Sequence, residues 1–160
     1  MKIAIGADGN GLALKDHLKA HLEGLGHEVE DFSEPQLDEE VDYPDVAHDV
    51  SKEVAANRFD RAVLVCGTGI GMAIVANKVP GVRAATASDP YSAERARKSN
   101  DAQVLCLGSL VVGQEVATLL VDHWLDSEFQ GGRSARKVAK IAAIDKQYAA
   151  AMDAVSADAG

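Results

Sequence analysis

The residues best suited to carry out chemistry lie between Arg61 and Lys78, where the chain reads RAVLVCGTGIGMAIVANK. An apolar run ends in Cys66, a ladder of alternating glycines follows, and a helical pattern of small residues begins at Met72. This order predicts a buried strand, a tight turn and a helix. The turn would place unpaired N–H groups beside the cysteine, and electropositive surroundings favour a thiolate. Cys66 is therefore a candidate reactive thiolate, although an inert buried cysteine is an equally good interpretation.

The glycines also test a dinucleotide-binding hypothesis. That fingerprint requires G-x-G-x-x-G after the first strand and an acid about 20 residues later. The first turn instead reads G-x-x-G-x-G from Gly6, and the central turn reads G-x-G-x-G from Gly67. No lysine follows the central ladder at the spacing of a phosphate-binding P-loop. The sequence therefore predicts no nucleotide cofactor, and we interpret Asp31, at the end of the second predicted strand, as an ordinary turn acid.

A basic cluster near the end of the chain is the second candidate site. Spacings of three, four and seven place most of its members on one face of a helix. A solvated helix face is the ordinary interpretation, but cations at a helix N-terminus oppose its dipole, and an anionic ligand would offset that cost. Arginine after Gly131-Gly132 could bind phosphate with its planar guanidinium. The cluster comprises Arg133, Arg136, Lys137 and Lys140.

The remaining metal-binding and redox residues give weaker signals. The five histidines include one i, i+4 pair, His17 and His21, without the surrounding HExxH of a zinc helix. Cys106 lies in a strand-like apolar run with no glycine turn after it, which favours a core position. Nothing in the two-cysteine pattern suggests a disulfide framework. We predict no metal and no organic cofactor.

Composition limits the kinds of partner. At 160 residues and 47% hydrophobic content, the chain is predicted to form one domain over residues 1–160. A formal net charge of −9 argues against nucleic acid and anionic membranes as partners. No apolar run is long enough to span a membrane, and residues 1–7 resemble a first strand rather than a signal peptide. We therefore expect a cytoplasmic protein.

The hydrophobic pattern alternates strands with helices along the whole chain, which predicts a parallel, doubly wound sheet with right-handed crossovers. An acidic, proline-containing loop is expected at residues 33–40, and fraying is expected after about Met152, within a tail at residues 149–160. The expected strands are residues 2–7, 29–32, 62–66, 82–87 and 104–107. The first expected helix carries the apolar stripe Leu12, Leu14, Leu18, Leu22 and Leu25. Four further helices are expected to begin at residues 42–44, 72, 90 and 113. The last expected helix is long and covers about residues 134–155.

Several sequence blocks together resemble the family of ribose-5-phosphate isomerase B and galactose-6-phosphate isomerase. The blocks are IAIGAD, DYP, VCGTGIGM, ANKVPGVRAA, DPYSAERAR, SNDAQVLCLGS, VVGQEVA and GGR, and they extend from Met1 to about Ile144. The resemblance implies an α/β fold of the Rossmann-like three-layer α/β/α type, with a five-stranded parallel sheet and a long C-terminal helix. It also implies a homodimer or a dimer of dimers, with an active site for a small phosphorylated sugar at the subunit interface.

The resemblance further implies aldose–ketose isomerisation through a cis-enediolate, which requires a base and preorganised donors but no metal. By position, Cys66 resembles the base, with Thr68 beside it. The family's oxyanion hole is resembled by the backbone amides of Gly67, Gly69, Ile70 and Gly71. Substrate-contacting positions are Asp8, Gly9, Tyr43, Ser99 and Asn100. Arg133, Lys137 and Arg136 resemble a phosphate site, which the partner subunit would supply.

Three positions depart from the ribose-isomerase pattern. Gly9 and Ser99 replace histidines, and Leu110 replaces an arginine that often contacts phosphate. The histidine missing at position 99 is credited with opening the furanose ring, and a serine hydroxyl cannot exchange protons near neutral pH as imidazole does. In a tetrose 4-phosphate, O4 carries the phosphate, so no furanose forms and no ring opening is needed.

Ribose 5-phosphate is therefore the default substrate, and erythrose 4-phosphate is the alternative that Ser99 favours. The segments Ser99-Asn100 and Gly132-Arg133-Ser134 are also similar to an erythrulose-4-phosphate isomerase branch of the family. A non-catalytic sugar-phosphate-binding protein is a further hypothesis, which the retained Cys66 disfavours. Isomerisation of an unphosphorylated sugar is weakened by Arg133 and Lys137.

Overall fold

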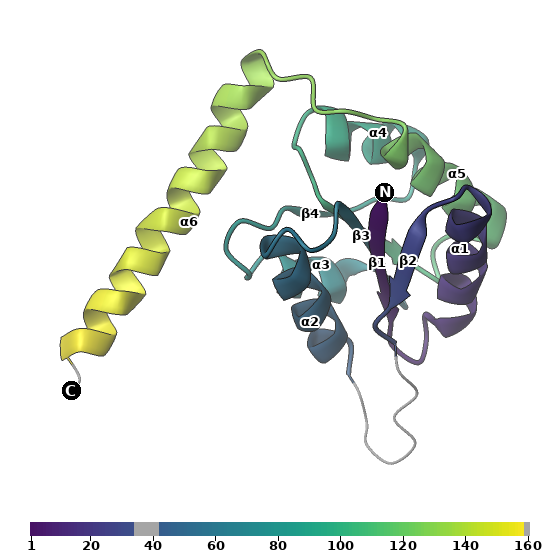
Figure 1. Ribbon diagram of the computed structural model, residues 1–160, viewed down its shortest axis with the longest axis horizontal. Coiled ribbons are helices and arrows are strands. Elements are labelled where there is room, and N and C mark those ends of the chain that lie inside the picture. The colour runs from purple at the N-terminus through teal and green to yellow at the C-terminus, as the bar shows by residue number, and fades with distance from the viewer. Residues whose placement is uncertain (34–41, 159–160) are drawn as a thin grey trace.

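The computed structural model describes residues 1–33 and 42–158, with side chains described up to residue 149. Its centre is one five-stranded sheet in the order β2-β1-β3-β5-β4, and every pair of neighbouring strands is parallel (Figure 1). The strands are β1 (Lys2–Ala7), β2 (Glu28–Asp31), β3 (Arg61–Cys66), β4 (Ala84–Thr86) and β5 (Val104–Gly108). The predicted α/β class and parallel sheet are confirmed, although β4 is shorter than the predicted 82–87.

Helices cover both faces of the sheet, so the fold has three layers (Figure 1). One face packs against α2 and α3, and the other packs against α1, α4 and α5. Each of these helices connects two parallel strands or follows the last one, which returns the chain to the opposite edge of the sheet. The helices are α1 (Leu12–Gly24), α2 (Tyr43–Ala55), α3 (Ile70–Ala76), α4 (Pro90–Lys98), α5 (Gln114–Leu125) and α6 (Arg133–Asp158).

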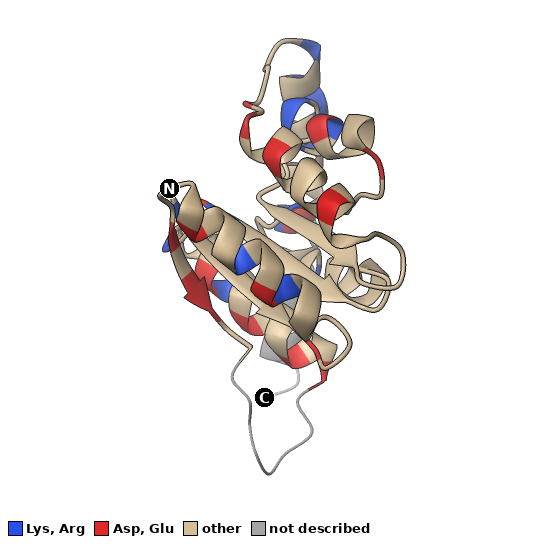
Figure 2. Ribbon diagram, turned by 90° about the vertical axis from the view of Figure 1, so that its right-hand side faces the viewer, with Lys and Arg blue, Asp and Glu red and all other residues tan. Residues whose placement is uncertain are grey.

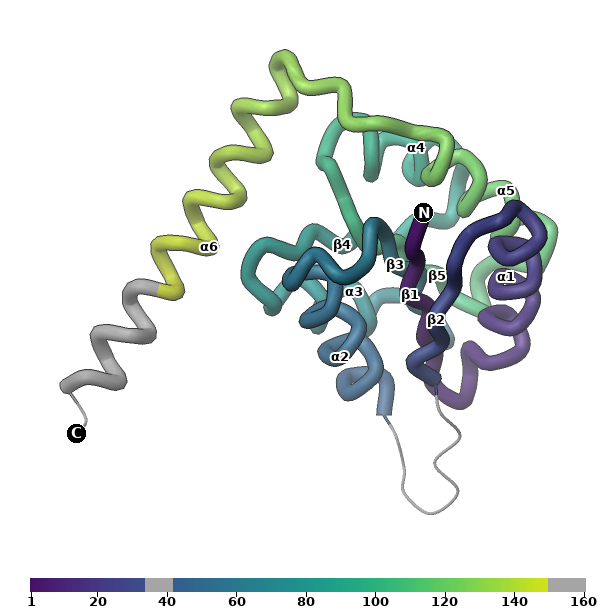
Figure 3. Tube along the Cα trace, viewed as in Figure 1, coloured from purple at the N-terminus to yellow at the C-terminus, as the bar shows by residue number. Residues whose placement is uncertain are grey.

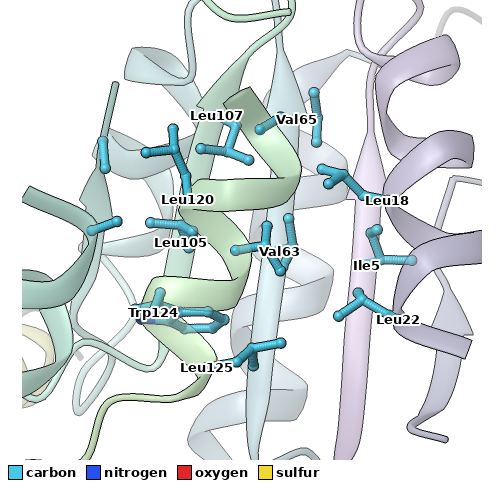
Figure 4. Close-up of a cluster of buried hydrophobic side chains, with 14 of the residues drawn as sticks. Ile5, Leu18, Leu22, Val63, Val65, Leu105, Leu107, Leu120, Trp124 and Leu125 are labelled. Carbon is cyan, nitrogen blue, oxygen red and sulfur yellow. The ribbon is translucent and has the colours of Figure 1, made fainter. Parts of the chain in front are cut away.

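The two central strands, β3 and β5, are buried along their whole length, which explains their unbroken apolar sequences. On the α1 and α5 side, leucines of both helices pack over valines and leucines of the sheet, with Trp124 at one end (Figure 4). The Trp124 indole N–H donates to the Ala102 carbonyl at 3.2 Å, so its one polar atom is satisfied. This closely packed centre holds the strand ends in fixed positions.

Local sequence sets the helix boundaries. The Asp42 side chain and the N3 residue Asp45 form a reciprocal capping box at the start of α2. The Asp89 carboxylate accepts the Ser92 N–H at 2.8 Å and caps α4. Within the predicted leucine stripe of α1, the inner members are buried, but Leu12 and Leu25 are exposed. The stripe was therefore predicted too long at both ends, because those two residues lie at the helix termini.

The long last helix is confirmed and extends away from the three-layer body (Figures 1 and 3). A hydrogen bond from the Gly81 N–H to the Asp145 carboxylate, 3.1 Å long, joins it to the loop before β4. Ile141, Ile144 and Tyr148 lie exposed on its surface. The helix begins at Arg133 and continues to Asp158, so the expected fraying stays a prediction. The predicted acidic loop lies outside the described residues except for Ser33.

Charge is unevenly placed on this framework. Lysine and arginine gather at the start of α6, whereas acidic residues are spread over the other helices and β2 (Figure 2).

Every helix in the described ranges is too short or too polar to cross a bilayer.

Candidate active site

The first part of the site lies at the carboxyl edge of the sheet, where β3 ends in Cys66. The cysteine side chain is only 5% exposed. The Gly69 N–H donates to Cys66 Sγ across the turn at 3.1 Å. Such a hydrogen bond strengthens when the sulfur carries negative charge. The predicted strand, glycine turn and helix are confirmed, and the turn does direct an amide at the sulfur.

Close packing explains the glycine at position 69. Its φ of +75° lies in the left-handed region, and a Cβ there would come within 2.9 Å of the Leu107 carbonyl carbon. The Thr86 hydroxyl, at the end of β4, donates to the Gly69 carbonyl at 3.2 Å. The turn is therefore fixed by β5 on one side and β4 on the other. This support was not apparent from the sequence, because it depends on strand order.

Two of the predicted oxyanion donors are already used inside the turn. The Gly69 N–H donates to Cys66, and the Ile70 N–H donates to Thr68 Oγ1 at 3.3 Å. The Thr68 hydroxyl accepts this bond, so its own proton stays free to donate to a ligand. The turn thus organises the cysteine and the threonine as much as it offers amides to a ligand.

Asp8 follows β1 and lies beside the end of β3. Its N–H donates to the Val65 carbonyl at 3.3 Å, and its Oδ1 accepts the N–H groups of Asn10 and Gly11 at 3.0 and 3.1 Å. The carboxylate is therefore held in a tight turn next to Cys66's strand. At Gly9, a Cβ would meet no atom within 4 Å, so the backbone does not require glycine there and space remains above it.

Tyr43 and Leu110 complete this edge. A Cβ at Gly71 would lie 2.6 Å from Tyr43 Cε2, which shows that the tyrosine ring packs directly over the glycine turn. Leu110 Cδ1 would lie 3.5 Å from a Cβ at Gly67, and the leucine is 81% exposed. An exposed apolar rim therefore borders the site. Its members are Ile70, Ile74, Leu110 and Val111.

The second part of the site lies at the opposite, amino edge of the sheet. Ser99 and Asn100 follow α4, which begins at the carboxyl edge and returns the chain toward the start of β5. The Asn100 carbonyl accepts from Arg83 Nε at 3.1 Å, and Arg83 precedes β4. One chain therefore does not bring Ser99 and Asn100 together with Cys66, and Figure 1 places the start of α6 on this same amino side.

A cavity of about 540 Å³ lies at this amino edge, between the end of α4 and the start of α6. Gly131 and Gly132, with φ of +64° and +56°, turn the chain into α6. Among the predicted ligands, the cavity is lined by Ser99, Arg133, Arg136 and Lys137. Lys140, the last member of the predicted basic cluster, does not line it. Three of the four members of the cluster therefore border a cavity, although all four side chains are exposed to solvent.

Sequence reasoning missed Arg95, Gln130 and Ser134, which also line this cavity. Arg95 lies four residues before Ser99 on α4, so helical spacing from a suspected ligand could have identified it. Gln130 could be placed only from the structure, because its N–H donates to the Lys98 carbonyl at 3.1 Å and so holds the linker against α4.

The weaker candidates lie elsewhere. Cys106 is completely buried, and this burial raises the pKa of its thiol, so the predicted core position is confirmed. Asp31 binds Lys15 and the Ser33 N–H, as suits a structural turn acid. His17 and His21 contact Thr118 and Asp122 on α5. Within the described ranges, no group of three or more metal-binding side chains is clustered, and the absence of a cofactor stays a prediction.

A cysteine held by a glycine turn at the carboxyl end of a central strand and a separate cationic cavity are features of an α/β protein suited to a small anionic ligand. The chain belongs to the Ribose/Galactose Isomerase family, whose model matches residues 3–141. This confirms the resemblance that the sequence blocks indicated.

Individual relatives cover nearly the whole chain. Ribose-5-P isomerase B of Listeria innocua is 52% identical over 92% of this chain and 99% of its own. D-erythrulose-4-phosphate isomerase of Pectobacterium atrosepticum is 48% identical over 92% and 97%. The solved structure of Clostridium thermocellum ribose-5-phosphate isomerase B superposes with a TM-score of 0.88 at 47% identity, covering 92% of this chain and 99% of that one. The two named activities occur at similar identity.

Proposed function

We propose that this chain is a sugar-phosphate isomerase that interconverts an aldose and a ketose, with ribose 5-phosphate and ribulose 5-phosphate as the default pair. The observation that carries the proposal is the hydrogen bond from the Gly69 N–H to Cys66 Sγ at the carboxyl edge of the sheet. This bond holds the Cys66 sulfur beside a turn of donors, which supports its proposed role as the base. Family membership and the similarity to named isomerases support the same reaction.

In the aldose-to-ketose direction, the Cys66 thiolate removes the proton from carbon 2. The electron pair forms the carbon–carbon double bond, and the carbonyl oxygen on carbon 1 gains negative charge. Thr68 donates to this oxygen, because its hydroxyl accepts from Ile70 and has its own proton free. After proton transfer between the two enediolate oxygens, the thiol returns its proton to carbon 1. Atoms and charge balance without an added reactant.

The complete site combines two subunits. Cys66 and Asp8 lie at one edge of the sheet, whereas Ser99 and the cationic cavity lie at the other, so a second copy is needed to bring them together. The exposed apolar rim beside Cys66 and the projecting α6 are surfaces that such a partner would cover. Arg133 and Lys137 of the partner subunit then bind the phosphate. Asp8 and the partner subunit's Asn100 contact the hydroxyls, and Tyr43 lines the pocket.

A second substrate is favoured by a specific observation, namely that neither edge of the described structure brings a histidine to the site. His17, His21 and His123 lie on α1 and α5, and His48 is exposed on α2. His27 lies just before β2, where its Nδ1 is 3.4 Å from the N-terminal nitrogen of Met1. Without imidazole, ring opening of a furanose has no good proton carrier at neutral pH. A tetrose 4-phosphate cannot form that ring, so erythrose 4-phosphate interconverting with erythrulose 4-phosphate is the second candidate.

A paired steady-state assay distinguishes the two substrates. The purified protein is assayed for ketose formation from ribose 5-phosphate and from erythrose 4-phosphate, and kcat/KM is compared. A larger value for the tetrose would support the second candidate, and a larger value for the pentose would support the first. The Ser99→His variant is the matched control, because it should raise the pentose-to-tetrose ratio of kcat/KM if ring opening limits the wild type. Turnover of neither sugar would contradict the proposed function.

A further inference from the structure

The cationic cavity at the amino edge contains an arginine that the proposed phosphate site does not use. Arg95 lies on α4, one turn before Ser99, and both line the cavity. Its backbone carbonyl accepts the Ser99 N–H at 3.0 Å and the Asn100 side-chain amide at 3.1 Å. Arg95 is thus anchored to the two residues that the proposed site places against the substrate.

The Arg95 guanidinium is only partly satisfied by the protein. Its Nη2 donates to Glu94 Oε1 at 2.7 Å, and its carbon lies 5.8 Å from the centre of the Tyr91 ring. Its Nε is buried and has no hydrogen-bond partner within the described residues. Buried donors without partners are costly, and a planar guanidinium has further N–H groups to offer a tetrahedral anion.

The charge balance around Arg95 also favours an anion. Glu94 is shared, since its other oxygen binds Lys98 at 2.9 Å. Among the described residues no carboxylate lines the cavity, whereas Arg133, Arg136 and Lys137 do. The one carboxylate that holds Arg95 therefore lies outside the cavity and is partly neutralised by a second cation.

We propose that Arg95 is a further phosphate ligand, which Glu94 holds back from the anion. The inference rests on the proposed function for the identity of the ligand. It adds Arg95 to the phosphate site, and it makes the Glu94 carboxylate a competitor of phosphate for the guanidinium. Phosphate entering the cavity competes with Glu94 for the terminal N–H groups of Arg95, and its affinity is set by how firmly Glu94 retains the guanidinium. The preference of the protein for phosphorylated sugars then depends on α4 as well as on α6.

The first test measures the Kd of inorganic phosphate by titration calorimetry for the full chain and the Arg95→Gln variant. Loss of a charge-assisted contact should weaken binding about tenfold. Lys140→Gln is the matched control, because it removes the same charge from exposed α6 outside the cavity and should change the Kd less than about twofold. Equal effects of the two variants on the Kd would overturn the proposal, since the loss of any nearby positive charge would then explain the weaker binding.

The second test predicts a change in the opposite direction, which a merely structural role for Arg95 would not give. Glu94→Gln releases the guanidinium, so phosphate should bind about threefold more tightly. Combining Glu94→Gln with Arg95→Gln should abolish this gain. Weaker or unchanged binding in Glu94→Gln would contradict the competition between carboxylate and anion.

Steady-state kinetics separate this inference from the proposed function. Arg95→Gln should raise KM for the sugar phosphate by a similar factor while kcat changes little, because the contact is to the phosphate and not to the reacting carbons. If phosphate binding depends on Arg95 but the wild type turns over no sugar phosphate, the proposed function fails and the Arg95 assignment stands. If the wild type is active but Arg95→Gln leaves phosphate binding unchanged, the proposed function stands and the Arg95 assignment fails.

Discussion

The two edges of the sheet differ in what forms the candidate site: a rigid backbone turn at the carboxyl edge and flexible charged side chains at the amino edge. At the carboxyl edge, Cys66 is nearly buried and is positioned by a backbone turn that packs against β4 and β5. At the amino edge, long charged side chains surround an open cavity. Proton transfer at carbon requires atoms within a few tenths of an ångström, which rigid backbone supplies. Phosphate carries its charge on several oxygens, so flexible cations suffice.

The difference also explains why the proposed site requires two chains. Parallel strands direct all their carboxyl ends to one edge, and the returning helices end at the other. Cys66, the proposed base on β3, and the cations that follow α5 therefore lie on opposite edges of the sheet by topology. Association of two copies is the simplest way for such a fold to place them around one substrate.

The largest predicted effect is at the rigid edge. Replacing Cys66 with alanine should lower kcat about a thousandfold, because general-base catalysis contributes roughly 10²–10⁴. Steady-state assays and circular dichroism of the purified variant measure activity and folding together. Cys106→Ala is the control, since it removes the other buried cysteine and should reduce stability while leaving kcat close to wild type. Similar kcat losses in both variants would show that core packing, and not the base, was lost.

The next prediction concerns the combination of the two edges. Cys66→Ala and Arg133→Ala should each be nearly inactive alone, but co-refolded mixtures should regain about a quarter of wild-type activity, since half of randomly formed dimers contain one intact site. Activity of the mixture is measured against each variant refolded alone. A mixture no more active than its components would show that both residues serve the same subunit.

At the carboxyl edge of the sheet, the local elements could be predicted from the sequence, but the contacts that support them could not. The strand, turn and helix around Cys66 followed from local pattern, because the apolar run, the alternating glycines and the small-residue helix are contiguous in sequence. The long last helix, predicted from about residue 134 and observed from Arg133, followed from an equally local pattern. The support of Gly69 by Thr86 and β5 could not be predicted, because it depends on which strands become neighbours.

The cavity residues were only half predictable for a similar reason. Arg133, Arg136 and Lys137 are adjacent in sequence and share a helix, so their charge pattern indicated them. Arg95 belongs to another helix, and only the packing of the linker against α4 brings it to the same cavity. Charge spacing reports what one element presents, whereas a site between elements depends on tertiary contacts.

An intermediate effect is expected when the rigidity of the glycine turn is tested. Gly69→Ala should destabilise the protein by about 3 kcal/mol, because a left-handed φ and a backbone clash combine. Gly81→Ala is the matched control: its φ is +86°, yet a Cβ there meets nothing within 4 Å. It should cost only about 1 kcal/mol from the conformation itself. Urea unfolding of both variants measures the difference, and equal costs would show that packing against β5 adds nothing.

The smallest effect is expected in the structural charge pair below the carboxyl edge. Lys15 Nζ lies 2.6 Å from Asp31 Oδ2, and their side chains are only 6% and 25% exposed. Burial alone would raise the pKa of Asp31, but hydrogen bonds from Lys15 and Ser33 lower it below its ordinary value. The pair therefore stabilises the fold above the unfolded-state pKa of an aspartate, near 4, and this contribution is lost as pH falls through the lower folded-state pKa.

Asp31→Asn should thus cost about 2 kcal/mol at neutral pH, and its difference from wild type should shrink as the pH is lowered below about 4. Urea unfolding between neutral and acid pH measures this slope. Asp49→Asn, which removes a carboxylate 3.0 Å from Lys52 on the exposed face of α2, should change stability by less than about 0.5 kcal/mol. If the Asp31 variant kept a constant deficit into acid, the lost stability would come from packing and not from the charge. The carboxyl edge would then owe its rigidity to the glycine turn and the sheet alone, which would sharpen its contrast with the charged cavity at the other edge.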